Sequence, residues 1–200
     1  MATAGPSPVP EALSLIELTS IPRGTRALDA LVKKAPIRLE RVGTVQPGKF
    51  VMMFSGDVAS VEASHAEALR VAEDGVHDEI LLPQIDPSVY EAARGHRAAW
   101  EGDTLGVVES QTMAGAVLAA DVAVKGAAVV VLSLRLGDEL GGKGLVHLMG
   151  EQHDVEAALS LVNERVPRLG RGLDTTLTPR LDDEVRGWLG RSTRFFGGDG

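Results

Sequence analysis

Few residues in this sequence stand at spacings that enzymes use for chemistry. The strongest candidate is the glycine-rich segment of residues 137–144, which fits the G-x-x-x-x-G-K part of a phosphate-binding loop. Such a loop needs Ser or Thr next, to bind magnesium, but position 144 is Gly. A helix must also follow, so that its N-terminus can hold phosphate, whereas residues 145–149 are typical of a strand. We therefore do not predict nucleotide binding.

The histidines give no clearer site. His147, Glu151 and His153 could be considered metal ligands, but they lack the spacing of a one-helix motif such as HExxH. We interpret these histidines as surface or packed residues. His65 lies on the apolar line of a predicted helix, which favours a buried or interfacial histidine over a catalytic one. The sequence therefore predicts no metal site.

Two acidic residues, Glu17 and Glu109, end corresponding predicted strands 92 positions apart. They could form a carboxylate pair, but their repetition favours a structural role, because duplicated catalytic acids would imply two sites. No Ser-His-acid order is legible either. We therefore predict a protein without enzymatic activity, catalytic residues or cofactor.

These acids belong to a tandem repeat that spans most of the chain. Residues 45–57 and 140–151 share a Gly-Lys that ends a loop, an apolar run, a Gly-acid pair and then a Val-Glu-Ala that opens a helical pattern. The Gly-Lys pairs are 94 positions apart, so a two-residue insertion lies in the loop around residues 137–141 of the second copy. A period this long exceeds that of solenoid repeats, and each copy is expected to bury its own core.

Composition limits the class of protein. The 200 residues are 44% hydrophobic and 24% charged, which is typical of globular proteins, with room for two domains of about 90 residues. A net charge of -8 and the absence of basic runs oppose nucleic-acid binding. The absence of cysteine excludes disulfides and thiolate metal sites. No targeting signal or membrane-spanning segment is legible, which predicts a cytoplasmic, soluble protein without a membrane partner.

Each copy shows the same order of elements. In the first copy, strands are predicted over residues 12–18, 37–45, 49–55 and 79–82, with helices between the first two and from Val58 to Gly75. In the second copy, strands are predicted over residues 104–109, 127–136, 143–149 and 173–177, with helices over 113–125 and 155–166. This β-α-β-β-α-β order predicts an α+β fold, an α/β sandwich of two ferredoxin-like split β-α-β domains with both helices on one face of an antiparallel sheet.

Domain boundaries follow from these elements and from composition. We expect a mobile N-terminal arm over residues 1–11, a first domain over 12–95, a second domain over 103–182 and a C-terminal tail over 183–200.

Several segments resemble the tandem-domain shell proteins of bacterial microcompartments, known as BMC-T proteins. They are residues 15–21, 29–33, 47–50 and 56–57, with counterparts at 106–109, 121–125 and 142–143, and the resemblance covers roughly residues 12–180. A family member from propanediol-utilisation compartments shares the Pro-Gly-Lys-Phe of residues 47–50. It has a cysteine at the position of Gln46, where three chains together hold an iron-sulfur cluster. Gln46 cannot act in this way.

The resemblance implies two BMC domains per chain and a homotrimer, with six domains around one axis. Such a pseudohexameric tile is a structural protein of the microcompartment shell, where it packs beside hexameric and pentameric shell proteins and has a central pore for metabolites. Whether the pore is gated, and whether two trimers stack face to face, stays open.

The resemblance also implies positions for the functional residues. The loop between the second and third strands of each domain lines the pore, which here means Gln46, Pro47, Gly48, Asp138, Glu139, Leu140, Gly141 and Gly142. The tile edge corresponds to Lys33, Lys125 and Arg180, although the first copy has Gln84 where the second has Arg180. A solvated helix end is the plain alternative for the two lysines.

Two questions remain open at this point. The longer second loop, with its glycines and its acids Asp138 and Glu139, predicts a gate with an anionic rim, and a rigid closed cap is the alternative. A different class of protein also fits the fold, namely a homotrimeric sensor or small-molecule-binding enzyme with ligands in its subunit clefts.

Overall fold

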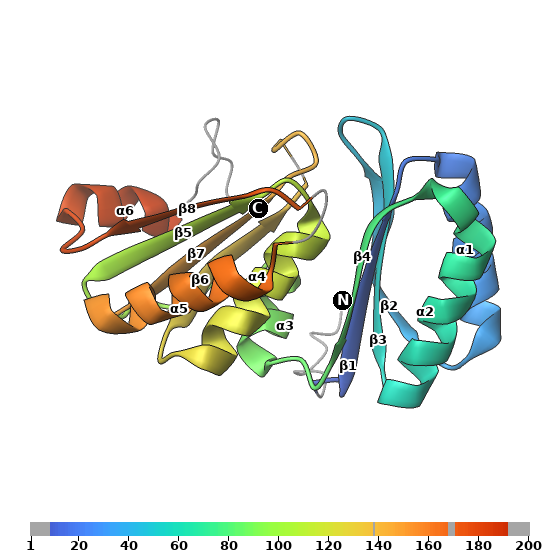
Figure 1. The fold of residues 1–200 in the computed structure, drawn as a ribbon, viewed down its shortest axis with the longest axis horizontal. Coiled ribbons are helices and arrows are strands. Elements are labelled where there is room, and N and C mark those ends of the chain that lie inside the picture. The colour runs from blue at the N-terminus through green and yellow to red at the C-terminus, as the bar shows by residue number, and fades with distance from the viewer. Residues whose placement is uncertain (1–8, 138, 168–170, 192–200) are drawn as a thin grey trace, which may run out of the picture.

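Two four-stranded antiparallel sheets form the computed structural model, which describes residues 9–137, 139–167 and 171–191 (Figure 1). The first sheet has the order β2-β3-β1-β4. Its strands are β1 (Ala12–Leu18), β2 (Arg38–Val45), β3 (Lys49–Gly56) and β4 (Val76–Pro83), and its helices are α1 (Ile21–Lys34) and α2 (Val58–Ala72), with a 3-10 turn at Glu73–Gly75.

The second sheet repeats this order as β6-β7-β5-β8. Its elements are β5 (Thr104–Ser110), α4 (Met113–Gly126), β6 (Val130–Leu136), β7 (Gly144–Gly150), α5 (Gln152–Arg165) and β8 (Leu173–Thr178). A short helix follows each sheet, namely α3 (Pro87–Ala93) and α6 (Asp183–Arg191). The tandem duplication and the ferredoxin-like α+β fold predicted from the sequence are therefore confirmed.

Equivalent side chains begin the first helix of each domain. The hydroxyl of Ser20 accepts a hydrogen bond from the backbone N of Arg23, and the hydroxyl of Thr112 accepts one from Gly115. Pro22 and Gly24 both lie inside α1, although such residues often end helices. Proline is tolerated in the first helical turn, where its missing N–H is not needed.

The prediction that each copy buries its own core is wrong for one face of the first sheet. One buried cluster joins Ile16, Phe54 and their neighbours to α1 and α2 on the outer face. A second cluster joins Leu13 and Leu15 of β1 to the second domain, where α4 lies against the opposite face (Figure 1). Because successive side chains of a strand point to opposite faces, all seven residues of β1 are buried, and the two domains share a core.

Strand β2 differs from β1, because most of its residues are exposed. Even its apolar residues Leu39 and Val42 project into solvent in the single chain, each about 40% exposed. Among the described residues, none of the helices has both the length and the apolar composition that a bilayer crossing requires.

The ends of the chain hold the largest departures from the prediction. The tail expected over residues 183–200 begins with helix α6, and residues 192–200 lie outside the described part of the chain. Most of the predicted N-terminal arm, residues 1–8, also lies outside it. Strand β4 begins three residues before the predicted start, and β6 begins three residues after it.

Candidate functional site

The candidate pore loops are hairpins that differ in length. In the β2–β3 loop, the backbone N of Gly48 donates to the carbonyl of Val45 at 2.9 Å. In the longer β6–β7 loop, Gly137 donates to the carbonyl of Lys143 at 2.9 Å. The longer loop turns through left-handed backbone at Glu139, Gly141 and Gly142. Asp138 lies outside the described residues.

These loops lie side by side, although 94 positions separate their Gly-Lys pairs. The ammonium group of Lys49 is 3.4 Å from the carbonyl oxygen of Gly142. A Cβ atom on Gly142 would lie only 2.9 Å from the carbonyl oxygen of Gln46. Figure 1 shows both hairpins at the same end of the molecule. The fold thus brings the β2–β3 and β6–β7 loops together at one end of the molecule.

The repeated lysine and glutamate hold each loop to its own sheet. Lys49 lies 3.0 Å from Glu17, and Lys143 lies 2.6 Å from Glu109. Strand β7 follows Lys143 directly, so the segment lacks the helix that a phosphate-binding loop requires. The repeated acids therefore act in structure, as the sequence indicated.

The two copies of this pair differ in burial because of the domain interface. Glu17 is fully buried and also accepts a hydrogen bond of 2.8 Å from the backbone N of Ala114, in the first turn of α4. Burial raises the pKa of Glu17, against the opposing effects of Ala114 and Lys49. The Glu109 side chain remains 40% exposed. Glu17 thus joins the first domain to the second, whereas Glu109, among the described residues, bonds to Lys143 of its own domain alone.

A second ionic contact crosses the same interface, and the sequence gave no sign of it. The guanidinium of Arg171 contacts Asp78 at 2.9 Å and donates to the carbonyl of Glu79 at 2.8 Å. The Asp78 carboxylate also accepts from the hydroxyl of Thr112 at 2.7 Å. Burial opposes the charge of Asp78, but the hydrogen bonds from Arg171 and Thr112 outweigh it and lower its pKa. Asp78 therefore links its own domain to both Thr112 and Arg171 of the second domain.

The predicted edge residues lie near the ends of equivalent elements. Lys33 pairs with Asp29 at 2.6 Å and Lys125 pairs with Asp121 at 2.7 Å, each one helical turn apart. The Asp121 carboxylate also accepts from the backbone N of Asp86, so its ion pair is more buried than that of Asp29.

Arg180 is exposed, with φ of 48°, and its counterpart Gln84 has φ of 55°. The backbone turn after the last strand is therefore repeated, and only the side chain differs between the copies.

The histidines occupy packed or exposed positions. His65 is largely buried, with Nδ1 2.8 Å from the Ser14 hydroxyl and Nε2 3.1 Å from Glu79. His147 is buried, with Nδ1 2.9 Å from the Ser133 hydroxyl, and His153 is exposed. Among the residues that the structure describes, no three His, Asp or Glu side chains form a group that could hold a metal ion.

The buried His147 gives a prediction for stability against pH. Burial, together with Arg97 and Arg135, lowers the pKa of His147 to about 4. Below pH 6.5 the unfolded chain therefore binds a proton that the native chain does not, and this group alone removes about 2 kcal/mol of stability between pH 7 and pH 5. We expect the free energy of unfolding of a His147→Gln variant, measured with denaturant, to fall by about 2 kcal/mol less than that of wild type between pH 7 and pH 5.

The matched control is His153→Gln, which makes the same substitution at an exposed position of the second domain. His65, whose pKa burial also lowers, is present in every variant and cancels in the difference. Equal losses of stability in wild type and His147→Gln would contradict the prediction.

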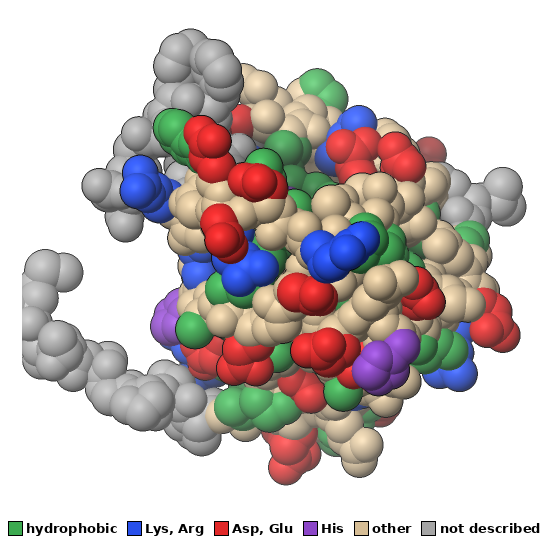
Figure 2. All heavy atoms as spheres, turned by 90° about the vertical axis from the view of Figure 1, so that its left-hand side faces the viewer, with side chains coloured by type: hydrophobic (Ala, Val, Ile, Leu, Met, Phe, Trp, Pro, Cys, Tyr) green, Lys and Arg blue, Asp and Glu red, His purple; other side chains and the backbone are tan. Residues whose placement is uncertain are grey.

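The charged surface agrees with the acidic composition. On the face at the second-domain end of the molecule, acidic side chains are scattered, and Lys and Arg side chains lie singly or in small groups between them (Figure 2). Nucleic-acid binding would require a continuous basic patch, and the described residues of this face do not form one.

Comparison with known proteins agrees with both the fold and the repeat. The family model of the BMC domain matches twice, at residues 12–85 and 104–181. The bacterial microcompartment shell protein PduT of Citrobacter freundii is 33% identical over 175 residues, which cover 88% of this chain and 95% of that protein.

Solved structures give the same result. A crystal structure of a microcompartment protein from Desulfitobacterium hafniense superposes with a TM-score of 0.75 at 32% identity, covering 90% of this chain and 99% of that one. A fused permuted hexameric shell protein of the RMM microcompartment shares the fold, with a TM-score of 0.58 at 22% identity over 76% of this chain and 81% of that one. With two matched BMC domains and a relative that spans nearly its whole length, the chain belongs to the BMC-domain family of bacterial microcompartment shell proteins.

Proposed function

We propose that this shell protein forms a homotrimeric, pseudohexameric tile with a central pore for metabolites. The observation that carries the proposal is the meeting of the two repeat loops, where Lys49 of one reaches Gly142 of the other at 3.4 Å. Equivalent loops from three chains would close one ring of six around an axis. The pore would be lined by Gln46, Pro47, Gly48 and the β6–β7 loop.

The contact between the two domains supports such a ring. It is head-to-tail, because the sheet of the first domain meets helix α4 of the second, and like surfaces do not face each other. A head-to-tail contact joins two different surfaces, so in a single chain each domain still exposes the surface that the other domain has used. If the same contact also formed between chains, both exposed surfaces would be covered, and three chains would supply six domains.

Glu139 makes the rim of the proposed pore anionic. Its carboxylate lies 3.8 Å from Arg135 and is 66% exposed. Three copies around an axis would repel anions and favour neutral or cationic solutes, with a range of about 8 to 10 Å at physiological ionic strength. Gly137, Gly141 and Gly142 can adopt several backbone conformations, which would let this loop swing between an inward and an outward position.

Solute entry tests this rim. Shells containing Glu139→Gln should admit an anionic substrate to an encapsulated enzyme faster than wild-type shells, by a factor of about 2 to 10 at low salt. The difference should fade at high salt, and a neutral substrate is the matched control. Equal entry of the anion at low salt would rule out an electrostatic pore and favour a closed cap.

Assembly with other shell components tests the function itself. Hexameric and pentameric shell proteins should be produced together with a tagged form of this chain, and the shells should be purified by sedimentation. We expect the tagged chain to sediment with the shells. A chain that stays in the supernatant but gains thermal stability with a specific metabolite would support a trimeric sensor instead.

A further inference from the structure

Helix α6 is the counterpart of α3 in the tandem repeat. Arg180, with its left-handed backbone, follows Gln84 by 96 positions (180 − 84), and the same offset relates α6 to α3. The helices also begin alike: the carboxylate of Asp86 accepts from the backbone N of Ser88 at 2.8 Å, and that of Asp182 accepts from Glu184 at 2.9 Å. The repeat therefore includes a helix that lies beyond the last strand of each sheet.

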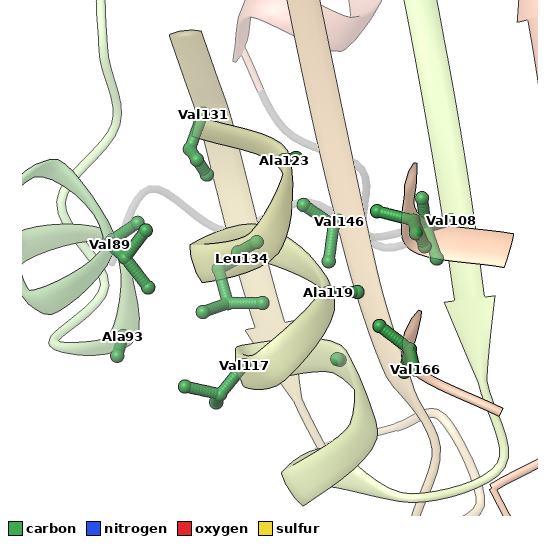
Figure 3. Close-up of a cluster of buried hydrophobic side chains, with 14 of the residues drawn as sticks. Val89, Ala93, Val108, Val117, Ala119, Ala123, Val131, Leu134, Val146 and Val166 are labelled. Atoms are coloured by element: carbon green, nitrogen blue, oxygen red, sulfur yellow. The ribbon is translucent and has the colours of Figure 1, made fainter. Parts of the chain in front are cut away.

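The first of these helices has a partner within the chain. Val89 of α3 is fully buried and Ala93 nearly so, in the core shared by the domains. Both side chains project from α3 toward Val117 and Leu134 of the second domain (Figure 3). Helix α3 thus fills an apolar surface formed by α4 and β6.

The second helix has no such apolar partner among the described residues of the single chain. Val185, the counterpart of Val89, is 44% exposed, and Trp188 on the same side of α6 is 66% exposed. None of the nine described residues of α6 is buried. The helix is nevertheless held in place, because Arg97 donates to the carbonyl of Leu189 and Arg186 lies over the ring of Trp100.

The surface that receives α3 also has an uncovered counterpart, on α1 and β2 of the first domain. In the covered copy, Met113, Val131 and Leu134 are at most 6% exposed. Their counterparts 92 positions earlier are apolar as well, but each is 40% exposed or more: Ile21, Leu39 and Val42. Seven large hydrophobic side chains are exposed among the described residues, and only Val9 lies outside α1, β2 and α6.

We propose that α6 of one chain packs on the α1–β2 surface of a second copy of this chain, as α3 packs on α4 and β6 within one chain. The inference rests on the proposed trimer and assigns its docking element. Val185 and Trp188 are the projecting half of the contact, and Ile21, Leu39 and Val42 are the receiving half. Buried aromatic anchors dominate the energy of such contacts, which gives Trp188 the central place.

Matched substitutions test the contact, because three valines of nearly equal exposure receive the same change. Val185→Glu and Val42→Glu each place a charge in one half of the contact, and Val9→Glu is the control outside it. Sedimentation at a series of concentrations should show each of the first two raising the trimer dissociation concentration at least about 30-fold, whereas Val9→Glu should not change it. Far-UV circular dichroism should show all three folded.

Cross-linking gives an independent readout, because the natural chain has no cysteine. Val185→Cys protein mixed with Val42→Cys protein should form a covalent dimer with a short bismaleimide, whereas either variant mixed with Val9→Cys should not. A stable trimer without this cross-link, and insensitive to both Glu variants, would overturn the α6 contact and leave the proposed trimer intact. A wild-type chain that remains monomeric would overturn both.

Discussion

The variant Glu17→Ala is expected to lower the free energy of unfolding by about 3 to 5 kcal/mol. Glu17 is fully buried between the domains, where it pairs with Lys49 at 3.0 Å and accepts from the backbone N of Ala114 at 2.8 Å. Its removal leaves the Lys49 ammonium largely buried without its counter-charge and the amide of Ala114 without its acceptor. Equilibrium denaturation in urea at pH 7 measures the loss.

The tandem repeat provides the control for this variant. Glu109→Ala removes the equivalent acid from a pair that is about 40% exposed on both sides, and such pairs contribute about 0 to 1 kcal/mol. Both variants should be measured at a protein concentration below that at which the trimer assembles, so that Glu109 remains exposed. Equal losses for the two variants would contradict the role of Glu17 as the link between the domains.

Reversal of both edge lysines is expected to abolish two-dimensional sheets and leave the trimer intact. Lys33 is 71% exposed and Lys125 43%, so their long side chains are available to pack against neighbouring tiles and donate to backbone carbonyls. The double variant Lys33→Asp, Lys125→Asp replaces these donors with acceptors of opposite charge. Electron micrographs at low salt should show isolated particles where wild type shows flat sheets.

The neighbouring residue Lys34 is a matched control for this experiment. It is exposed in the same last turn of α1 but lies one position from the predicted edge. Lys34→Asp changes the charge of the chain by the same amount per site and should still form sheets. If the double variant forms sheets as wild type does, the edge assignment is wrong.

The fold could be predicted from the sequence because the repeat allowed each predicted element to be compared with its counterpart in the other copy. The acid of the first Gly-acid pair, Asp57, precedes the predicted helical pattern, and its carboxylate accepts from the backbone N of Ser60 at 2.9 Å. The interpretation of Glu17 and Glu109 as structural acids also came from their repetition. The helix cap and the paired acids depend on residues of a single domain, so the local sequence pattern and its repetition were sufficient to predict them.

Contacts between the domains were beyond this kind of prediction. The ion pair of Asp78 and Arg171 joins residues 93 positions apart. Asp78 is repeated as Asp174, but Arg171 corresponds to Gly75, so the repeat carries no sign of the pair. The shared core was missed because a mostly apolar strand such as β1, with Ser14 and Glu17 as its polar residues, does not show from its sequence which domain covers its second face.

Helix α6 was missed because Gly187 and Gly190 weaken its helical pattern, and because its apolar residues are not buried against the rest of the described chain. A signal was nevertheless present. Shifting the repeat by 96 positions aligns residues 87–93 with 183–189, and with them the capping acids Asp86 and Asp182. The unpartnered state of α6 is itself what a head-to-tail assembly predicts.

The central claim is that three chains form one tile of six similar domains. Native mass spectrometry of the purified, untagged chain tests it most directly. A chain of 21.0 kDa predicts a species of three chains, 3 × 21.0 = 63.0 kDa, with face-to-face stacking giving twice that mass. A species of one or two chains at concentrations where sheets form would contradict the trimeric tile.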